Sequence, residues 1–177
     1  MRLVVTGAVG SGKTTFIRTI SEIEVVDTDR IATDDLALWK ETTTVALDFG
    51  TLQFAPGMNL HLYGTPGQAR FDFMWDILIR KAHAYVVLVA AHRPNQFQFT
   101  RDLIDFMDGH GDIPMIIGIT HTDCEDALKV EEITKALGYE EENNQAPIVC
   151  VNCNETTSVS QALIVLVGKL METSTVT

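Results

Sequence analysis

The residues with the clearest chemical meaning lie at positions 7–14, in the run GAVGSGKT. This run fits the pattern G-x-x-x-x-G-K-[ST], in which glycines let backbone N–H groups turn inward around an anion. Lys13 would bring a point charge to the β- and γ-phosphates of a nucleotide, and the Thr14 hydroxyl would bind Mg²⁺. The other residues expected to contact phosphate, mainly through backbone N–H groups, are Gly7, Val9, Gly10, Ser11, Gly12 and Thr15.

The surroundings of this run favour a phosphate site over a chance glycine-rich turn. An apolar strand is predicted at 2–6 (RLVVT), directly before the run, and a helix is predicted from about Lys13. A helix N-terminus attracts anions, because its first N–H groups have no partner within the helix. The sequence therefore predicts nucleotide binding.

The rest of the chain alternates short apolar runs with amphipathic stretches, as βαβ units do. Five further strands are expected at 45–54, 58–63, 85–91, 115–119 and 148–151, and further helices near 71–82, 97–107, 128–137 and 159–170. Pro56-Gly57 is a turn signal, so the strands on either side of it should be antiparallel. We predict an α/β fold: a three-layer αβα P-loop NTPase over 1–177, a single domain whose six-stranded, mostly parallel sheet has one antiparallel edge strand.

Four more segments with recognisable motifs follow the phosphate loop along the chain. They are TTTVALDFG at 42–50, LYGTPGQARF at 62–71, THTD at 120–123 and VNCNETTSV at 151–159. With GAVGSGKTT at 7–15, they resemble the motifs of Ras-like small GTPases, most closely the MglA-type and conservon-associated GTP-binding proteins. The resemblance covers nearly all of the chain. It implies GTP and GDP as ligands, Mg²⁺ as cofactor, and switch loops that respond to the γ-phosphate.

The resemblance also assigns roles in the two switch segments. Thr44 would complete the Mg²⁺ shell, with Thr43 as the alternative in register, and the long polar stretch at 21–44 would be the first switch loop. Gly67 would present an N–H group to the γ-phosphate. Gln68 is the expected catalytic residue, because a glutamine there orients the attacking water.

Base recognition would fall to two loops. Thr120-His121-Thr122-Asp123 stands where the family has N-K-x-D, and a carboxylate at Asp123 can accept hydrogen bonds from guanine N1 and N2; its alternative role is a helix N-cap. His121 could stack on the purine, whereas Thr120 alters the contacts that tie this loop to the phosphate loop. Cys153 and Asn154 lie where the family donates a backbone N–H to guanine O6. Preference for guanine over adenine stays open.

Three departures from the family bear on hydrolysis. Gly64 replaces the aspartate that usually touches Mg²⁺ through water, and Asp48 is either its replacement or a solvent-facing carboxylate. Val9 replaces a glycine beside the γ-phosphate, and Arg30 is too far from Thr44 to serve as a built-in arginine finger. A missing finger costs about 10³–10⁵ in rate. We expect slow hydrolysis that depends on an activator; the alternative is a low-turnover nucleotide-binding scaffold.

Composition narrows the partners. A formal net charge of −11 disfavours binding to nucleic acid, and no membrane anchor or signal peptide is recognised, so a cytoplasmic location is expected. The resemblance implies a protein effector and an activator, for which it suggests a small roadblock-fold protein. A small-molecule kinase is a poorer reading, because its lid would need more basic residues than 13 Lys and Arg supply. The three cysteines, Cys124, Cys150 and Cys153, are expected to be ordinary thiols.

Overall fold

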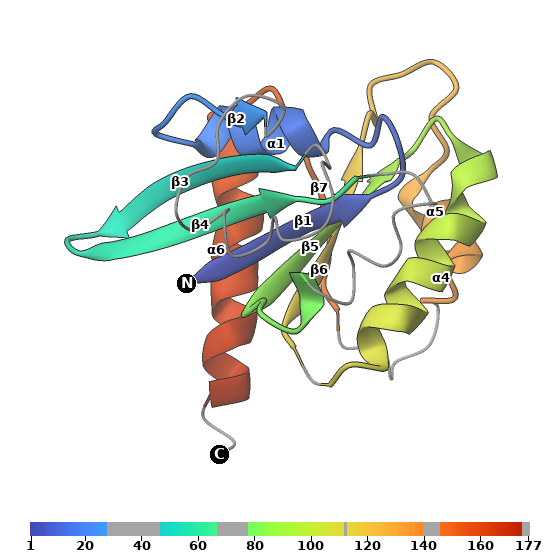
Figure 1. Cartoon of the computed structure of the whole chain (residues 1–177). Helices are drawn as coiled ribbons and strands as arrows, with labels where there is room; N and C mark the ends of the chain where they lie inside the picture. Colours follow the sequence, from blue (N-terminus) through green and yellow to red (C-terminus); the bar gives the residue numbers. More distant parts are fainter. Residues whose placement is uncertain (28–46, 67–77, 112, 140–145, 175–177) are drawn as a thin grey trace.

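The computed structural model describes residues 1–27, 47–66, 78–111, 113–139 and 146–174, and a seven-stranded sheet runs through its centre (Figure 1). The strands lie in the spatial order β2-β3-β4-β1-β5-β6-β7. Their bounds are β1 Arg2–Gly7, β2 Val26–Asp27, β3 Asp48–Ala55, β4 Met58–Gly64, β5 Ala84–Ala90, β6 Met115–Thr120 and β7 Ile148–Cys150. The phosphate loop follows β1, the strand at the middle of this order.

The pairing confirms a mostly parallel sheet. β1 runs parallel to both β4 and β5, and β6 runs parallel to β5 and β7. β3 is antiparallel to β4, as Pro56-Gly57 predicts, and Gly57 has the positive φ of 75° that such a turn requires. One strand was not predicted: β2 pairs antiparallel with Asp48 and Phe49, outside β3. Two residues carry too little pattern to be recognised without their partner.

Helices cover both faces, which confirms the three layers (Figure 1). α1 (Lys13–Ile20) and α6 (Thr156–Ser174) pack on one face, and α4 (Phe97–Asp108) and α5 (Val130–Ala136) pack on the other. Alternate residues of β1 serve the two cores, because side chains in a strand point to opposite faces. Val4 lies in the core beneath α4 and α5, whereas Leu3 and Val5 lie in the core beneath α1 and α6.

The helix predicted to reach residue 82 ends earlier. Among its described residues, only Leu78 and Ile79 are helical. Lys81 N–H donates to Leu78 O and Ala82 N–H donates to Ile79 O. These bonds span three residues rather than four, so the chain tightens into turns before β5.

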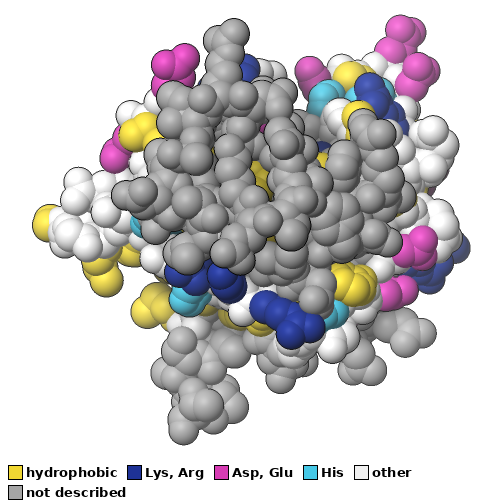
Figure 2. Space-filling model, in the orientation of Figure 1, with side chains coloured by type: hydrophobic (Ala, Val, Ile, Leu, Met, Phe, Trp, Pro, Cys, Tyr) yellow, Lys and Arg dark blue, Asp and Glu magenta, His cyan; other side chains and the backbone are white. Residues whose placement is uncertain are grey.

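The surface reflects the acidic composition. On the face shown in Figure 2, acidic side chains are spread around the rim rather than gathered in one cluster. The formal net charge of −11 disfavours association with polyanions. None of the described helices combines the length and the apolar character needed to cross a membrane.

Candidate nucleotide-binding site

The loop between β1 and α1 has the backbone of a phosphate cradle. Gly7 has φ 140° and lies against β5, so an added Cβ would be only 2.3 Å from Leu88 O. Gly12 has φ 99° and is the N-cap of α1, a left-handed conformation that favours glycine. The chain thus leaves a buried strand, turns sharply and enters a helix, an arrangement that can bind an anion at the helix N-terminus. Within the loop, Ser11 N–H donates to Ala8 O at 3.2 Å.

Lys13 is the buried cation of this loop. Its Nζ donates to Gly7 O at 2.8 Å and Ala8 O at 2.7 Å, and the residue is 8% exposed. Burial lowers the pKa of Lys13 from 10.5 to about 8, and the Asp48 carboxylate opposes this shift. Two neutral carbonyls do not balance a buried ammonium group. The site therefore favours an anion.

The Thr14 hydroxyl meets a carboxylate from a neighbouring strand. Thr14 Oγ1 donates to Asp48 Oδ2 at 2.5 Å, and Asp48 is half-buried. Asp48 pairs with Gly64 across β3 and β4. A Cβ added at Gly64 would lie 3.0 Å from Asp48 Cβ and 3.2 Å from Asp48 Oδ2. The Asp48 side chain thus occupies the space that a side chain at position 64 would need, and it does not point freely into solvent.

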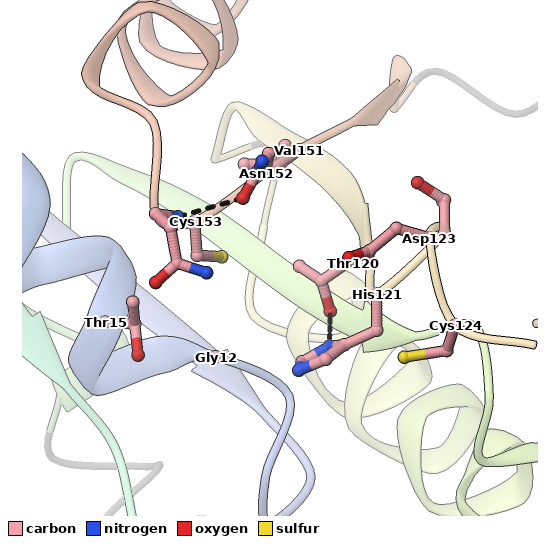
Figure 3. Close-up of a pocket in the computed structure, with 11 residues that line it drawn as sticks. Gly12, Thr15, Thr120, His121, Asp123, Cys124, Val151, Asn152 and Cys153 are labelled. Carbon is pink, nitrogen blue, oxygen red and sulfur yellow. Dashed lines mark hydrogen bonds between the residues drawn. The ribbon is translucent and has the colours of Figure 1, made fainter.

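A hollow lies beside the phosphate loop, at the carboxyl ends of β6 and β7 (Figure 3). It has a volume of about 170 Å³. The residues lining it are Gly12, Thr15, Thr120, His121, Thr122, Asp123, Cys124, Val151, Asn152, Cys153 and Asn154. The structure therefore brings the predicted base-recognition residues together beside the start of α1.

Thr120 ties this hollow to the phosphate loop. It is 1% exposed, and its Oγ1 donates to Ser11 O at 2.9 Å and lies 3.3 Å from Val89 O. Oγ1 also lies 2.9 Å from His121 Nδ1. Because a hydroxyl has one proton, donation to Ser11 O leaves Oγ1 to accept from a protonated Nδ1. Thr120 therefore links the loop after β6 to the phosphate loop.

His121 holds a constrained position at the mouth of the hollow. It is the one non-glycine residue of the described chain with a positive φ, 57°. Its ring points toward Gly12 (Figure 3) and lies 4.8 Å from the ring of His92, centroid to centroid. Burial lowers the pKa of His121, as do His92 and Arg93, whereas Asp123 raises it. The imidazole is therefore kept neutral and can offer an aromatic face to a ligand.

The loop after β7 supplies the opposite wall. Cys153 is buried, and its Sγ would lie 3.0 Å from a Cβ added at Gly12. Thr19 Oγ1 on α1 donates to Cys153 O at 2.6 Å, and Asn154 N–H donates to Asn152 Oδ1 at 3.1 Å. Burial raises the pKa of the Cys153 thiol to about 11. The cysteine therefore acts as a small packing residue that fixes the loop against the phosphate cradle.

Two residues at this site were not predicted from the sequence. Arg93 Nη1 and Gln96 Nε2 each donate to Val9 O at 3.1 Å, from the turn that follows β5. The signal that could have located them is topological. β5 is the neighbour of β1, so the residues after β5 come out beside the residues after β1.

Several predicted residues lie outside the described part of the chain. These are Thr44 with its alternative Thr43, Gly67, the expected catalytic Gln68, and Arg30. The described chain reaches the second switch segment as far as Pro66. Thr65 is tied to β1 there, because its N–H donates to Val5 O at 3.0 Å and its Oγ1 lies 2.7 Å from Thr6 Oγ1.

Comparison with known proteins agrees with this architecture. A family model described as "conserved hypothetical ATP binding protein" matches residues 23–145. Among solved structures, the chain is similar to the Arl6 (BBS3) small GTPase of Trypanosoma brucei with the bound nucleotide analogue GppNp. That match has a TM-score of 0.72 at 17% identity and covers 97% of this chain and 98% of the other. At that identity the likeness shows the fold alone. No curated protein matches significantly.

Proposed function

The chain belongs to the family of conserved hypothetical ATP-binding proteins, and from this premise and the geometry of its site we propose that it is a GTP-binding molecular switch. It would hydrolyse GTP slowly to GDP and signal through two switch loops. The observation that carries the proposal is the glycine cradle, with the ammonium group of Lys13 buried against Gly7 O and Ala8 O. Such a cation is best stabilised by a polyphosphate.

The choice of guanine over adenine rests on Asp123. A carboxylate accepts two hydrogen bonds from guanine N1 and N2, whereas adenine presents no such pair of donors. Asp123 lines the hollow opposite Cys153, where a purine would lie between the two loops. The family description names ATP, so the relative affinity for guanine and adenine nucleotides is the first quantity to measure. We expect D123N to weaken GTP binding and to gain affinity for the xanthine analogue, since an amide can donate to the 2-oxo group.

The donor set also fits a magnesium ion. Mg²⁺ prefers hard oxygen ligands, and the Thr14 hydroxyl and Asp48 carboxylate meet at the start of α1. We propose that Thr14 ligates the ion with Thr44 and that Asp48 replaces the aspartate missing at position 64. When bound, Mg²⁺ would neutralise charge on the β- and γ-phosphates. Asp48 is well placed for this role because no side chain at Gly64 competes for its space.

The hydrolytic step is assigned to the second switch segment. Gly67 would hold the γ-phosphate through its N–H group, and Gln68 would orient the attacking water for in-line displacement. Val9, 48% exposed on the phosphate loop, narrows the approach of a catalytic group from a partner. We therefore propose a slow intrinsic rate. We also propose that the chain is related to the MglA-type GTPases. Its activator would then be a roadblock-fold protein.

One preparation tests these points. We would titrate the purified chain with GTP, GDP, ATP and ADP, with and without Mg²⁺, and then follow phosphate release in a single turnover. We expect guanine nucleotides to bind more tightly than adenine nucleotides in Mg²⁺, with slow release of phosphate. K13A should abolish binding, whereas K135A, on the exposed side of α5, should not.

The rival function is a scaffold that holds nucleotide without cycling. Gly64 and the altered base motif favour it, because both remove groups that most Ras-like proteins use. Q68A separates the two readings, and Q161A on the exposed face of α6 is its matched control. A switch requires Q68A to lower phosphate release while Q161A leaves it unchanged. If both variants release phosphate at the rate of the unmodified chain, the scaffold function is supported instead.

A further inference from the structure

Two side-chain donors converge on one carbonyl on the outside of the phosphate loop. Arg93 Nη1 and Gln96 Nε2 both donate to Val9 O at 3.1 Å. Gln96 ends the short 3₁₀ helix η2 (Pro94–Gln96), and Arg93 directly precedes it. The turn after β5 is thus clamped to the loop after β1.

Val9 O belongs to the same peptide group as the N–H of Gly10. The described chain contains no cis peptide bond, so Val9 O and the N–H of Gly10 point in opposite directions. Because Val9 O accepts from Arg93, the Gly10 N–H points away from the guanidinium. In the proposed site this N–H is one of the phosphate donors. A Cβ added at Gly10 would lie 2.5 Å from Arg93 Nη1, so a glycine is needed for this close approach. A charge-assisted bond to one end of a peptide strengthens the donor at the other end.

Arg93 brings a positive charge to the phosphate loop. Within the described ranges, no carboxylate forms a salt bridge with Arg93, and its Nε donates to the neutral acceptor His92 Nε2 at 3.1 Å. Gln96 adds a second donor and no charge, and its Oε1 is buried without a described partner. Among the described residues, the hydrogen-bond partners of the Arg93 guanidinium are therefore neutral groups.

We propose that Arg93 is a positioning residue that makes the loop discriminate between triphosphate and diphosphate. The guanidinium holds and polarises the Val9–Gly10 peptide, and its charge favours the ligand with the additional negative charge. This inference rests on the proposed function, since it concerns the same phosphate site. One unit of charge acting across the loop at an effective dielectric constant near 20 changes affinity by about tenfold.

The test separates the charge of Arg93 from its hydrogen bond. R93K keeps the charge, R93Q keeps an N–H donor without charge, and R101A removes an exposed arginine of α4 as the matched control. For each folded variant we would measure the dissociation constants of GTPγS and GDP in Mg²⁺, single-turnover phosphate release, and urea unfolding. If the unmodified chain prefers adenine, ATPγS and ADP take their place.

We expect R93Q to lose about tenfold of the preference for GTPγS over GDP and to slow phosphate release to a similar extent. R93K and R101A should retain the preference. Equal weakening of both ligands by R93Q, or a similar loss in R93K, would reduce Arg93 to a structural clamp and overturn the inference. If the unmodified chain binds neither nucleotide pair, the proposed function itself fails; if it binds them and R93Q changes nothing, only the role of Arg93 fails.

Discussion

An aspartate introduced at position 64 should destabilise this protein. Gly64 on β4 lies opposite Asp48 on β3, and an added Cβ would sit 3.0 Å from Asp48 Cβ and 2.9 Å from Ile17 Cδ1. Overpacking of this kind costs about 1–3 kcal/mol. A second carboxylate beside Asp48 adds repulsion, which the pair can relieve in part by sharing a proton. We expect G64D to lower the free energy of unfolding by about 3 kcal/mol.

The paired exchange should recover most of that loss. In D48G/G64D the crowded Cβ and the first carboxylate are gone, so one carboxylate again lies near the Thr14 hydroxyl. Only the flexible end of Ile17 then needs to move. We expect the double variant to regain at least half of the stability lost in G64D. Such coupling identifies two side chains that compete for one space.

Urea unfolding measures the stability, and GDP affinity with and without Mg²⁺ measures the site. The matched control is G168D on α6, where an added Cβ meets nothing within 4 Å; we expect it to change stability by less than about 0.5 kcal/mol. D48N should reduce the gain in affinity that Mg²⁺ gives. The reasoning is refuted if G64D is as stable as G168D, or if D48N keeps the full effect of Mg²⁺.

Three further outcomes follow from the site. Because burial lowers the pKa of Lys13 from 10.5 to about 8, the contribution of Lys13 to the stability of the nucleotide-free chain should grow as pH rises from 8 to 10.5, whereas nucleotide affinity should fall by about fivefold between pH 8 and pH 9 as Lys13 loses its proton. Calorimetry of the unmodified chain and of K13R at each pH measures both quantities, and K13R should lack this contribution. T120V leaves buried Ser11 O without its donor and should cost about 1–3 kcal/mol in urea unfolding; an unchanged midpoint would show that this link is dispensable. At pH 8, iodoacetamide should modify exposed Cys150 well before buried Cys153, whose thiol has a pKa of about 11; mass spectrometry gives the order, and the reverse order would contradict the burial argument.

The phosphate loop could be predicted because its chemistry is local. Glycines, a lysine and a threonine at fixed spacing, placed between a strand and a helix, determine their own arrangement over a few residues. The mostly parallel sheet was predictable for a similar reason, since each strand carries its own apolar run. Thr120, His121, Asp123 and Cys153 could be placed near one another because the carboxyl ends of parallel strands meet at one edge.

Contacts across the sheet could not be predicted in this way. The sequence left two readings of Asp48, and only the register of β3 against β4 sets it opposite Gly64 and beside Thr14. Arg93 lies 84 positions from Val9 and carries no motif. Its role depends on β5 pairing with β1, which brings the two following turns together.

The amino-acid sequence by itself determined that this protein has a glycine-rich loop between a strand and a helix, a nucleotide-binding α/β fold and a carboxylate in the loop predicted to recognise the base. The tertiary structure alone decided which side chains support that cradle from outside: Asp48 in the space left by Gly64, Thr120 on Ser11 O, and Arg93 on Val9 O. The physical reason is how far apart along the chain the interacting residues lie. Backbone turns and helix starts depend on neighbours in the chain, whereas the partners of a buried carbonyl or hydroxyl are chosen by strand order and register.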